Sequence, residues 1–275
     1  MNIIYELNPP KILHGESFNL SLLSQEIEKF LSRASIVLGI TRHVHLTDSV
    51  LGIPRLSSIT AAQLISKEIE SPITNLTCSI RTRDRNMNSI IQSVADSVML
   101  KIKGLLFIQG DKPSYGSLDI SRGSPKPTEV INTLNSLGFG NLINLDLSIP
   151  NEISNISNFR KKIRSKPSKF ITQSISSIEE IRKLKSMLET ECLGEDNNNN
   201  NTNEGISQIS LIPCIMVPSA KNQKAANMIG LDWSQYEHNF YEFIEKIGDL
   251  GINEILLTSP NSFDEGISVL KKISN

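Results

Sequence analysis

Cysteine is scarce in this sequence, and its few copies lie far apart. Cys78, Cys192 and Cys214 are the only three among 275 residues. An odd number of cysteines at such separations supports neither a disulfide framework nor a zinc site, and it suits a reducing compartment. We therefore expect a cytoplasmic protein without a bound metal.

An excess of charge of either sign is also missing. The chain carries 28 basic and 29 acidic residues, for a net charge of −1 and a pI near 6.5. No global field therefore favours nucleic acid or an anionic membrane as a partner. The basic run at residues 160–164 is short, and we interpret it as a solvated helix face.

Long apolar runs and several common site motifs are absent as well. No run approaches the roughly 20 residues that span a bilayer, and no charged-then-apolar leader precedes the first expected strand. The chain has no G-x-G-x-x-G in a strand-to-helix context, no P-loop and no G-x-S-x-G elbow. The pair in "HVH" (43–45) lacks a third metal ligand, so we expect two loop histidines that make ordinary hydrogen bonds.

What the chain does have is a regular series of β-rich apolar runs separated by stretches with helical spacing. Leu20, Leu23, Ile27 and Leu31, for example, share one helix face. The alternation predicts a single (β/α)8 barrel, an α/β fold, over residues 1–275, and a doubly wound open sheet is the alternative. The eight runs are "IIYEL" (3–7), "SIVLGIT" (35–41), "ITNLTC" (73–78), "GLLFIQG" (104–110), "LINLDL" (142–147), "KFITQSI" (169–175), "ISLIPCIM" (209–216) and "NEILLTS" (253–259).

A low-complexity segment interrupts this pattern. "GEDNNNNNTNEG" (194–205) follows the sixth expected helix and precedes the seventh strand. It has nothing to bury, so we expect a disordered Asn-rich insertion without a catalytic role.

The stretch "IIYELNPPK" (3–11) places Glu6 at the end of an apolar strand, just before Pro9 and Pro10. An unpaired buried carboxylate is costly, so Glu6 is either paired or used. In barrels of this kind the chemistry occurs where strands end, and nearly every expected strand turns polar there. The pattern predicts an active site built from residues that include Glu6, Asn8, Thr41, Arg42, His43, Asn75, Thr77, Gln109, Asp111, Asp146, Gln173 and Thr258.

Several of these segments resemble methylenetetrahydrofolate reductases. "YELNPPK" is similar to their F-E-F-x-P-P-K opening, "ITNLTC" to P-H-L-T-C, and "IQGDKP" to L-R-G-D-x-P. "FITQ" matches I-T-Q, and "LIPCIMVPSAKNQ" is similar to I-P-G-I-x-P. Residues 45–92 are closest to the short single-domain homologues with T-D-N…R-M-S-S and C-R-D-R-N. The matches fall in order on six strands and cover most of the chain.

The resemblance implies a flavin-containing barrel that reduces a 5,10-methylene-tetrahydropterin to its 5-methyl form. FAD would be the cofactor, and NAD(P)H or another reductant the electron donor. The substrate would be a folate or a methanopterin, and the family allows a homo-oligomer without nucleic acid or membrane partners. The family histidine and arginine are replaced here by Asn75 and Gln109, and the fifth-strand loop is reduced to "IPNEIS" (149–154).

Site residues carry over position by position from the same resemblance. Glu6 would be the general acid that protonates the pterin nitrogen, with a raised pKa; a salt bridge to an arginine is the alternative. Asp111 would act beside flavin and pterin, or else as a helix N-cap or turn residue. Gln173 would bind the substrate. The flavin contacts would be Thr41, Asn75, Gln109, Gly110, Asp111 and Lys162, of which Lys162 is otherwise a solvated charge.

Two other functions compete with this reductase. One is a divergent barrel that binds a folate-like pterin without flavin, as a subunit of a methyl-transfer or redox complex. The other is a scaffold subunit that keeps only the fold. Retention of Glu6, Asp111 and Gln173 together favours an enzyme.

Overall fold

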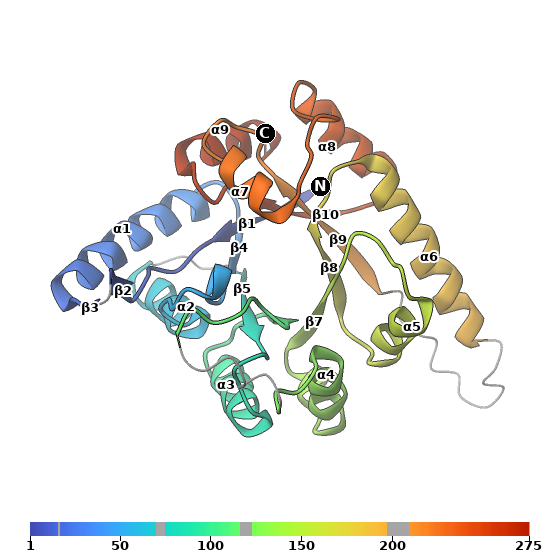
Figure 1. The fold of residues 1–275 in the computed structure, drawn as a ribbon, viewed down its shortest axis with the longest axis horizontal. Coiled ribbons are helices and arrows are strands. Elements are labelled where there is room, and N and C mark those ends of the chain that lie inside the picture. The colour runs from blue at the N-terminus through green and yellow to red at the C-terminus, as the bar shows by residue number, and fades with distance from the viewer. Residues whose placement is uncertain (16, 70–74, 116–122, 197–208, 275) are drawn as a thin grey trace. The chain divides into compact units, whose positions relative to one another are not determined.

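The computed structural model describes residues 1–15, 17–69, 75–115, 123–196 and 209–274. Its main sheet is a closed barrel of eight strands in the order β1-β10-β9-β8-β7-β6-β5-β4, and helices cover the outside of the strands in Figure 1. All the described strand pairs of this barrel are parallel. The predicted (β/α)8 barrel is confirmed, and the alternative open sheet is wrong.

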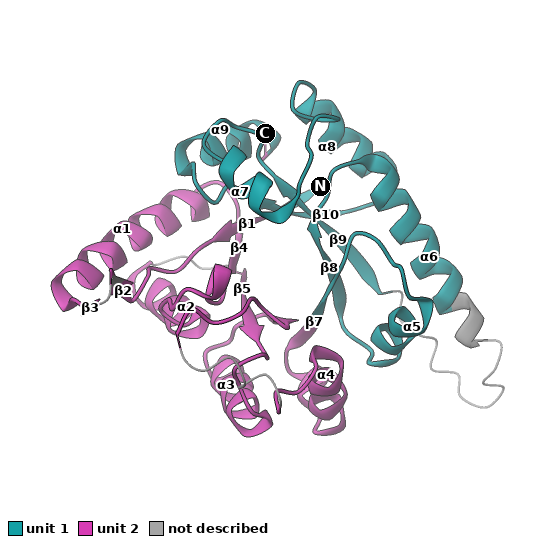
Figure 2. Cartoon of the chain, viewed as in Figure 1, with its two compact units in different colours: residues 1–3, 146–273, 275 teal, residues 4–145, 274 magenta. Residues whose placement is uncertain are grey.

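The chain divides into two compact units, drawn in different colours in Figure 2. Unit 2 covers residues 4–145 and 274, and unit 1 covers residues 1–3 and 146–273.

Unit 2 holds the first half of the barrel and a small antiparallel hairpin, β2–β3. Its elements are β1 (Asn2–Leu7), β2 (Leu13–His14), β3 (Ser17–Phe18), α1 (Leu20–Leu38), β4 (His43–Leu46), the 3-10 helix η1 (Val50–Gly52), α2 (Ser58–Glu68), β5 (Asn75–Arg81), α3 (Met87–Met99), β6 (Gly104–Ile108), α4 (Pro127–Ser136) and the 3-10 helix η2 (Phe139–Asn141).

Unit 1 holds the second half, and β7 begins just before it. Its elements are β7 (Asn144–Ile149), α5 (Ile156–Arg164), β8 (Lys169–Ser174), α6 (Ile178–Asp196), β9 (Ser210–Met216), α7 (Gln223–Ile229), α8 (Phe240–Asp249), β10 (Glu254–Thr258) and α9 (Phe263–Ser274). The predicted insertion at 194–205 begins inside α6, and its residues from 197 onward lie outside the described part of the chain.

The predicted second strand at 35–41 is wrong, because α1 runs through it as far as Leu38. Asn19 caps this helix, its side-chain oxygen accepting the Leu22 N–H at 3.0 Å. Phe30, Ala34 and Val37 then repeat at helical spacing and are buried. The strand that occupies this place in the barrel is β4, "HVHL", which the apolar pattern did not reveal.

The third strand is also longer than predicted. β5 continues past Cys78 to Arg81, so its carboxyl end lies three residues further along the chain. This shift matters because the polar groups at that end are different from the ones expected.

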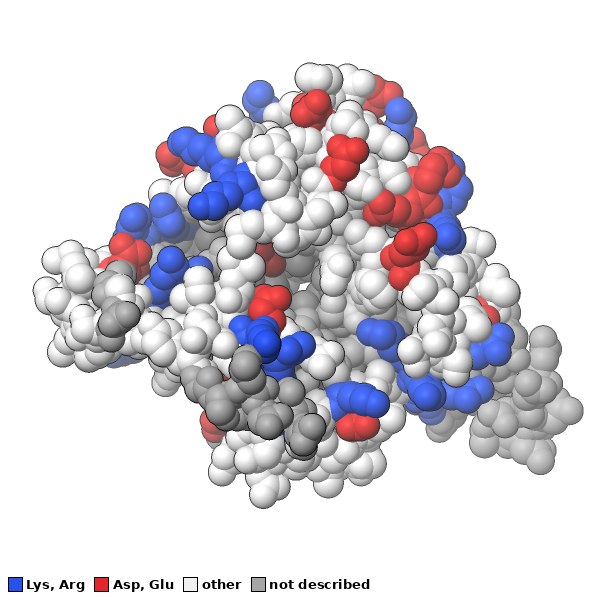
Figure 3. Space-filling model, viewed as in Figure 1, with Lys and Arg blue, Asp and Glu red and all other residues white. Residues whose placement is uncertain are grey.

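The basic run at residues 160–164 lies on α5, and lysine and arginine side chains gather over this helix in Figure 3. Arg160 donates to the Glu191 carboxylate of α6 at 2.6 Å, and both Arg160 and Lys161 are exposed. These two positions fit the predicted solvated face, but Lys162, discussed below, does not.

Candidate functional site at the strand ends of unit 2

Glu6 stands on the sheet face that points away from the helices. It pairs in register with His45 of β4, which pairs with Thr77 of β5. The next residue, Cys78, points the other way, since its thiol donates to the Ser58 carbonyl of α2. Neighbours in parallel register share a face, so Glu6, His45 and Thr77 form one row. Glu6 is partly exposed, whereas Tyr5 and Leu7 beside it are buried.

The imidazole of His45 is buried and stays neutral. Its Nδ1 is hydrogen-bonded to Thr77 Oγ1 and its Nε2 to Ser79 Oγ, each at 2.8 Å. Burial lowers the pKa of His45 to about 4. At neutral pH this ring therefore offers Glu6 a polar neighbour without a positive charge. The hydrogen bonds expected for the histidine pair are confirmed, but both residues lie in a strand and not in a loop.

A partly buried ion-pair network connects the carboxyl ends of β4 and β5. Asp48 Oδ2 accepts the Arg81 backbone N–H at 3.1 Å and Arg85 Nη2 at 2.9 Å. Arg81, only 2% exposed, donates to Asp84 Oδ2 at 2.7 Å. Sequence reasoning missed this network because it ended the third strand at Cys78. The signal was present in "RTRDRN" (81–86), whose alternating charges follow a buried strand directly.

The loop after β4 is fastened to two neighbouring strand ends. Arg81 Nη1 donates to the Ser49 carbonyl at 2.9 Å, and the Leu51 N–H donates to Asp111 Oδ2 at 2.9 Å. Ser114 donates to the Gly52 carbonyl through both its N–H and its hydroxyl. Asp111 therefore joins the loops after β4 and β6.

Two glycines allow these loops to approach so closely. A Cβ on Gly52 would lie 1.9 Å from the Lys112 carbonyl oxygen, and a Cβ on Gly110 would lie 2.7 Å from Arg81 Cγ. Both glycines have a positive φ, +70° and +81°, that other residues rarely adopt. The space beside Gly110 is thus filled by the protein's own arginine.

The Pro9-Pro10 segment that follows β1 is bound to the loop after β4. Arg55 Nη1 donates to the Pro9 carbonyl at 2.7 Å, and the Pro10 carbonyl accepts the Leu56 N–H at 2.9 Å. Thr47 Oγ1 donates to Asn8 Oδ1 at 2.7 Å. The four strand ends of unit 2 are therefore interlocked, with Glu6 on the first of them.

The predicted flavin contacts in unit 2 do not lie together. Thr41 precedes β4 and Asn75 begins β5, so both occupy the amino ends of their strands. Gln109, Gly110 and Asp111 follow the carboxyl end of β6. The expectation that Thr41 and Asn75 end their strands is wrong, because each strand begins and ends later than the pattern suggested.

As a single set, these residues do not fit one flavin. Asn75 and Arg81 are separated by the length of β5, about 20 Å at the usual rise per residue. The Asn75 amide is already bonded to His43 Nε2 at 2.9 Å. Gly110, which in such a loop would give a phosphate access to the backbone, packs against Arg81.

Lys162 and Gln173 lie in unit 1. Lys162 Nζ donates to the Ser148 carbonyl at 2.6 Å, and burial lowers the pKa of Lys162, so it is not a solvated charge. Gln173 is exposed near the end of β8, where the register with β9 shifts between Ile171 and Ser174. Such bulges re-aim side chains at functional sites.

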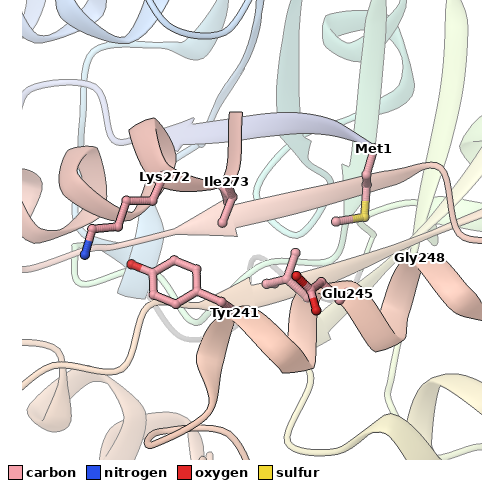
Figure 4. Close-up of a pocket in the computed structure, with 7 residues that line it drawn as sticks. Met1, Tyr241, Glu245, Gly248, Lys272 and Ile273 are labelled. Carbon is pink, nitrogen blue, oxygen red and sulfur yellow. The ribbon is translucent and has the colours of Figure 1, made fainter. Parts of the chain in front are cut away.

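A hollow of about 490 Å³ lies elsewhere in unit 1, shown in Figure 4. Lys272 lies over the Tyr241 ring at 5.4 Å at one end, and Glu245 and Met1 lie at the other. Its charged groups are exposed, and they come from α8 and α9 rather than from strand ends. We do not assign it to the candidate site.

Within the described residues, no group of three or more His, Cys, Asp or Glu side chains is placed to hold a metal ion. None of the helices in the same residues is long and apolar enough to cross a membrane.

Comparison with solved structures shows which fold the chain has. It is similar to EDTA monooxygenase from Chelativorans sp. BNC1, with a TM-score of 0.58 and 8% identity over 99% of this chain and 94% of that one. It also resembles an aldolase, with a TM-score of 0.52 and 11% identity over 99% of this chain and 93% of that one. A ligand-free tryptophan synthase from M. tuberculosis has a TM-score of 0.52 and 8% identity over 99% of this chain and 91% of that one. At such identities the likeness establishes a (β/α)8 barrel alone.

No family model matches the chain, and neither does any curated protein. The similarity to methylenetetrahydrofolate reductases stays a prediction from the sequence.

Proposed function

We propose that the protein is a barrel enzyme that converts a 5,10-methylene-tetrahydropterin to its 5-methyl form, with Glu6 as the acid. The single observation that carries this proposal is the row formed by Glu6, the neutral His45 and Thr77. The neutral ring of His45 adds no positive charge that would hold the neighbouring carboxyl group in its ionised form.

The proposed chemistry begins with proton transfer from Glu6 to the bridged pterin nitrogen. This step opens the methylene bridge to an iminium, and the iminium carbon then accepts a hydride to become the methyl group. Asp111, which lies in the same unit as Glu6, stabilises the cation through the carboxylate oxygen that Leu51 does not use. The hydride comes from a reductant outside this set of residues.

The substitution Glu6→Gln tests the acid. It keeps size and hydrogen bonding but cannot deliver a proton, so we expect methylene-tetrahydrofolate reduction to fall by a factor on the order of 10² to 10⁴. Binding of 5-methyltetrahydrofolate should change little. Undiminished reduction would remove Glu6 from the mechanism, and loss of binding as well would make Glu6 a structural residue.

A second candidate is the flavin-dependent form of the same reductase. Lys162 favours it, because a half-buried ammonium with a lowered pKa is unusual on a solvated helix and suits an anionic cofactor group. The visible spectrum of the purified protein, before and after addition of FAD, separates the two forms. Flavin absorbance that survives desalting would support the second, and a colourless protein that still binds the pterin would support the first.

A further inference from the structure

Leu51 is held in a conformation that leucine rarely adopts. Its φ and ψ are 59° and 23°, in the left-handed region, and Ser49 two residues earlier has a φ of 44°. A side chain with a Cβ is disfavoured there, and glycine or asparagine would relieve the strain. Strain of this kind concentrates at ligand-binding sites, where the surrounding structure maintains it.

The backbone of this loop, and not the Leu51 side chain, makes the contacts that hold it. Arg81, Asp111 and Ser114 bind the Ser49 carbonyl, the Leu51 N–H and the Gly52 carbonyl respectively. The Leu51 side chain remains 44% exposed. The hydrogen bonds that hold this loop therefore do not require a leucine side chain at this position.

The surroundings of Leu51 indicate what its side chain meets. Its own N–H is bound to Asp111, and its loop follows β4, the strand that pairs with β1 at Glu6. An exposed aliphatic group whose backbone is bound to the Asp111 carboxylate suits a ligand with an apolar flat face and a polar, nitrogen-rich edge. Charged groups alone would suit a small polar ligand instead.

We propose that Leu51 is a substrate-contact residue, presented by a strained and fastened loop to the flat face of a heterocyclic ring. This inference rests on the proposed function, in which the ring is a reduced pterin. The Leu51 side chain packs on the ring face while Glu6 and Asp111 meet its polar edge. The backbone strain is the consequence of holding an apolar group in that place before the ligand arrives.

Two glycine substitutions separate the side chain from the strain. Leu51→Gly relieves the left-handed conformation and removes the contact, whereas Ser49→Gly relieves the same kind of strain and keeps Leu51. Thermal unfolding and calorimetric titration with 5-methyltetrahydrofolate are measured for both. We expect both variants to unfold within a few degrees of the wild type. Binding should weaken about tenfold or more in Leu51→Gly and should be unchanged in Ser49→Gly.

A third variant, Leu51→Met, keeps an apolar side chain of similar size and should bind within a fewfold of the wild type. A large drop in unfolding temperature for Leu51→Gly alone would make Leu51 a packing residue and overturn the inference. Wild-type binding by Leu51→Gly, or weakened binding by Ser49→Gly, would overturn it and leave the proposed function standing. A wild-type protein that does not bind this probe would overturn the proposed function and the ring contact together.

Discussion

Asp146 and Lys169 are neighbours that do not form an ion pair with each other. Asp146 accepts a hydrogen bond from the Lys169 backbone and feels the charge of its ammonium. The ammonium itself is bonded to Glu254 at 2.5 Å, and Asp146 Oδ1 is buried without a hydrogen-bond partner among the described residues. Burial, the largest influence, raises the pKa of Asp146 to about 7, with Glu254 raising it further and Lys169 opposing.

This arrangement predicts a loss of stability as the pH rises toward 7. The usual pKa of an aspartate is 3.8, so between about pH 4 and 7 the folded state holds a proton that the unfolded chain has released. The free energy of unfolding then falls by up to roughly 1.4 kcal/mol per pH unit and levels off above pH 7. The asparagine in Asp146→Asn cannot titrate. The free energy of unfolding of this variant, relative to that of the wild type, should therefore rise by roughly 2–3 kcal/mol between pH 5 and pH 8.

Urea denaturation at the two pH values measures this gain. Asp232→Asn is the matched control, because hydrogen bonds from Ser234 lower the pKa of Asp232 and keep it ionised throughout the range. A stability difference between Asp146→Asn and the wild type that is the same at pH 5 and pH 8 would show that Asp146 is already ionised at pH 5.

Gly110→Ala should destabilise the protein through contact with Arg81 as well as through its φ of +81°. Gly138→Ala is the matched control, because Gly138 has a φ of +85° and nothing within 4 Å of an added Cβ. We expect about 1–2 kcal/mol of destabilisation from the left-handed backbone alone in the control. The clash in Gly110→Ala should add roughly 1–3 kcal/mol. Equal losses in chemical denaturation would mean that Arg81 moves aside freely.

His45 should remain neutral in the folded protein down to about pH 5, because burial lowers its pKa to about 4. Its ring ¹⁵N shifts, assigned by the absence of the signal in His45→Gln, should stay constant between pH 8 and pH 5.5. A histidine with an ordinary pKa of about 6.5 would titrate within this range. Titration of His45 there would place a cation beside Glu6 and weaken the case for Glu6 as an acid.

The sequence predicted the barrel well because its signal is repetitive. Runs such as 104–110 and 253–259 are apolar on both faces, and the helices between them bury one stripe each, so most elements could be recognised alone. The prediction of a strand at 35–41 was wrong because a short apolar run such as Ile36, Val37 and Leu38 is compatible with either a helix or a strand. Only the packing of Phe30 and Ala34 on the same side as Val37 decides between them.

The site was harder to predict because its contacts join distant parts of the chain. The ring of His45 is held by Thr77 and Ser79, and Asp111 is held by the Leu51 N–H. No local pattern reveals which hydroxyl will meet an imidazole across a sheet. The resemblance did select Glu6 and Asp111, both of which lie at strand ends of unit 2, but it also grouped Thr41 with them.

The interlocked loops of unit 2 also determine the order in which the protein can mature. Their hydrogen bonds connect Leu51 with Asp111, Gly52 with Ser114 and Gly15 with Tyr115, across 60, 62 and 100 residues of chain. Contacts between residues so far apart in the sequence form slowly, because the entropy cost of closing a long loop comes before the contact contributes any stability. On a ribosome, the helices of the first half can form as they emerge, but the candidate site has to wait until the loop after β6 has been synthesised.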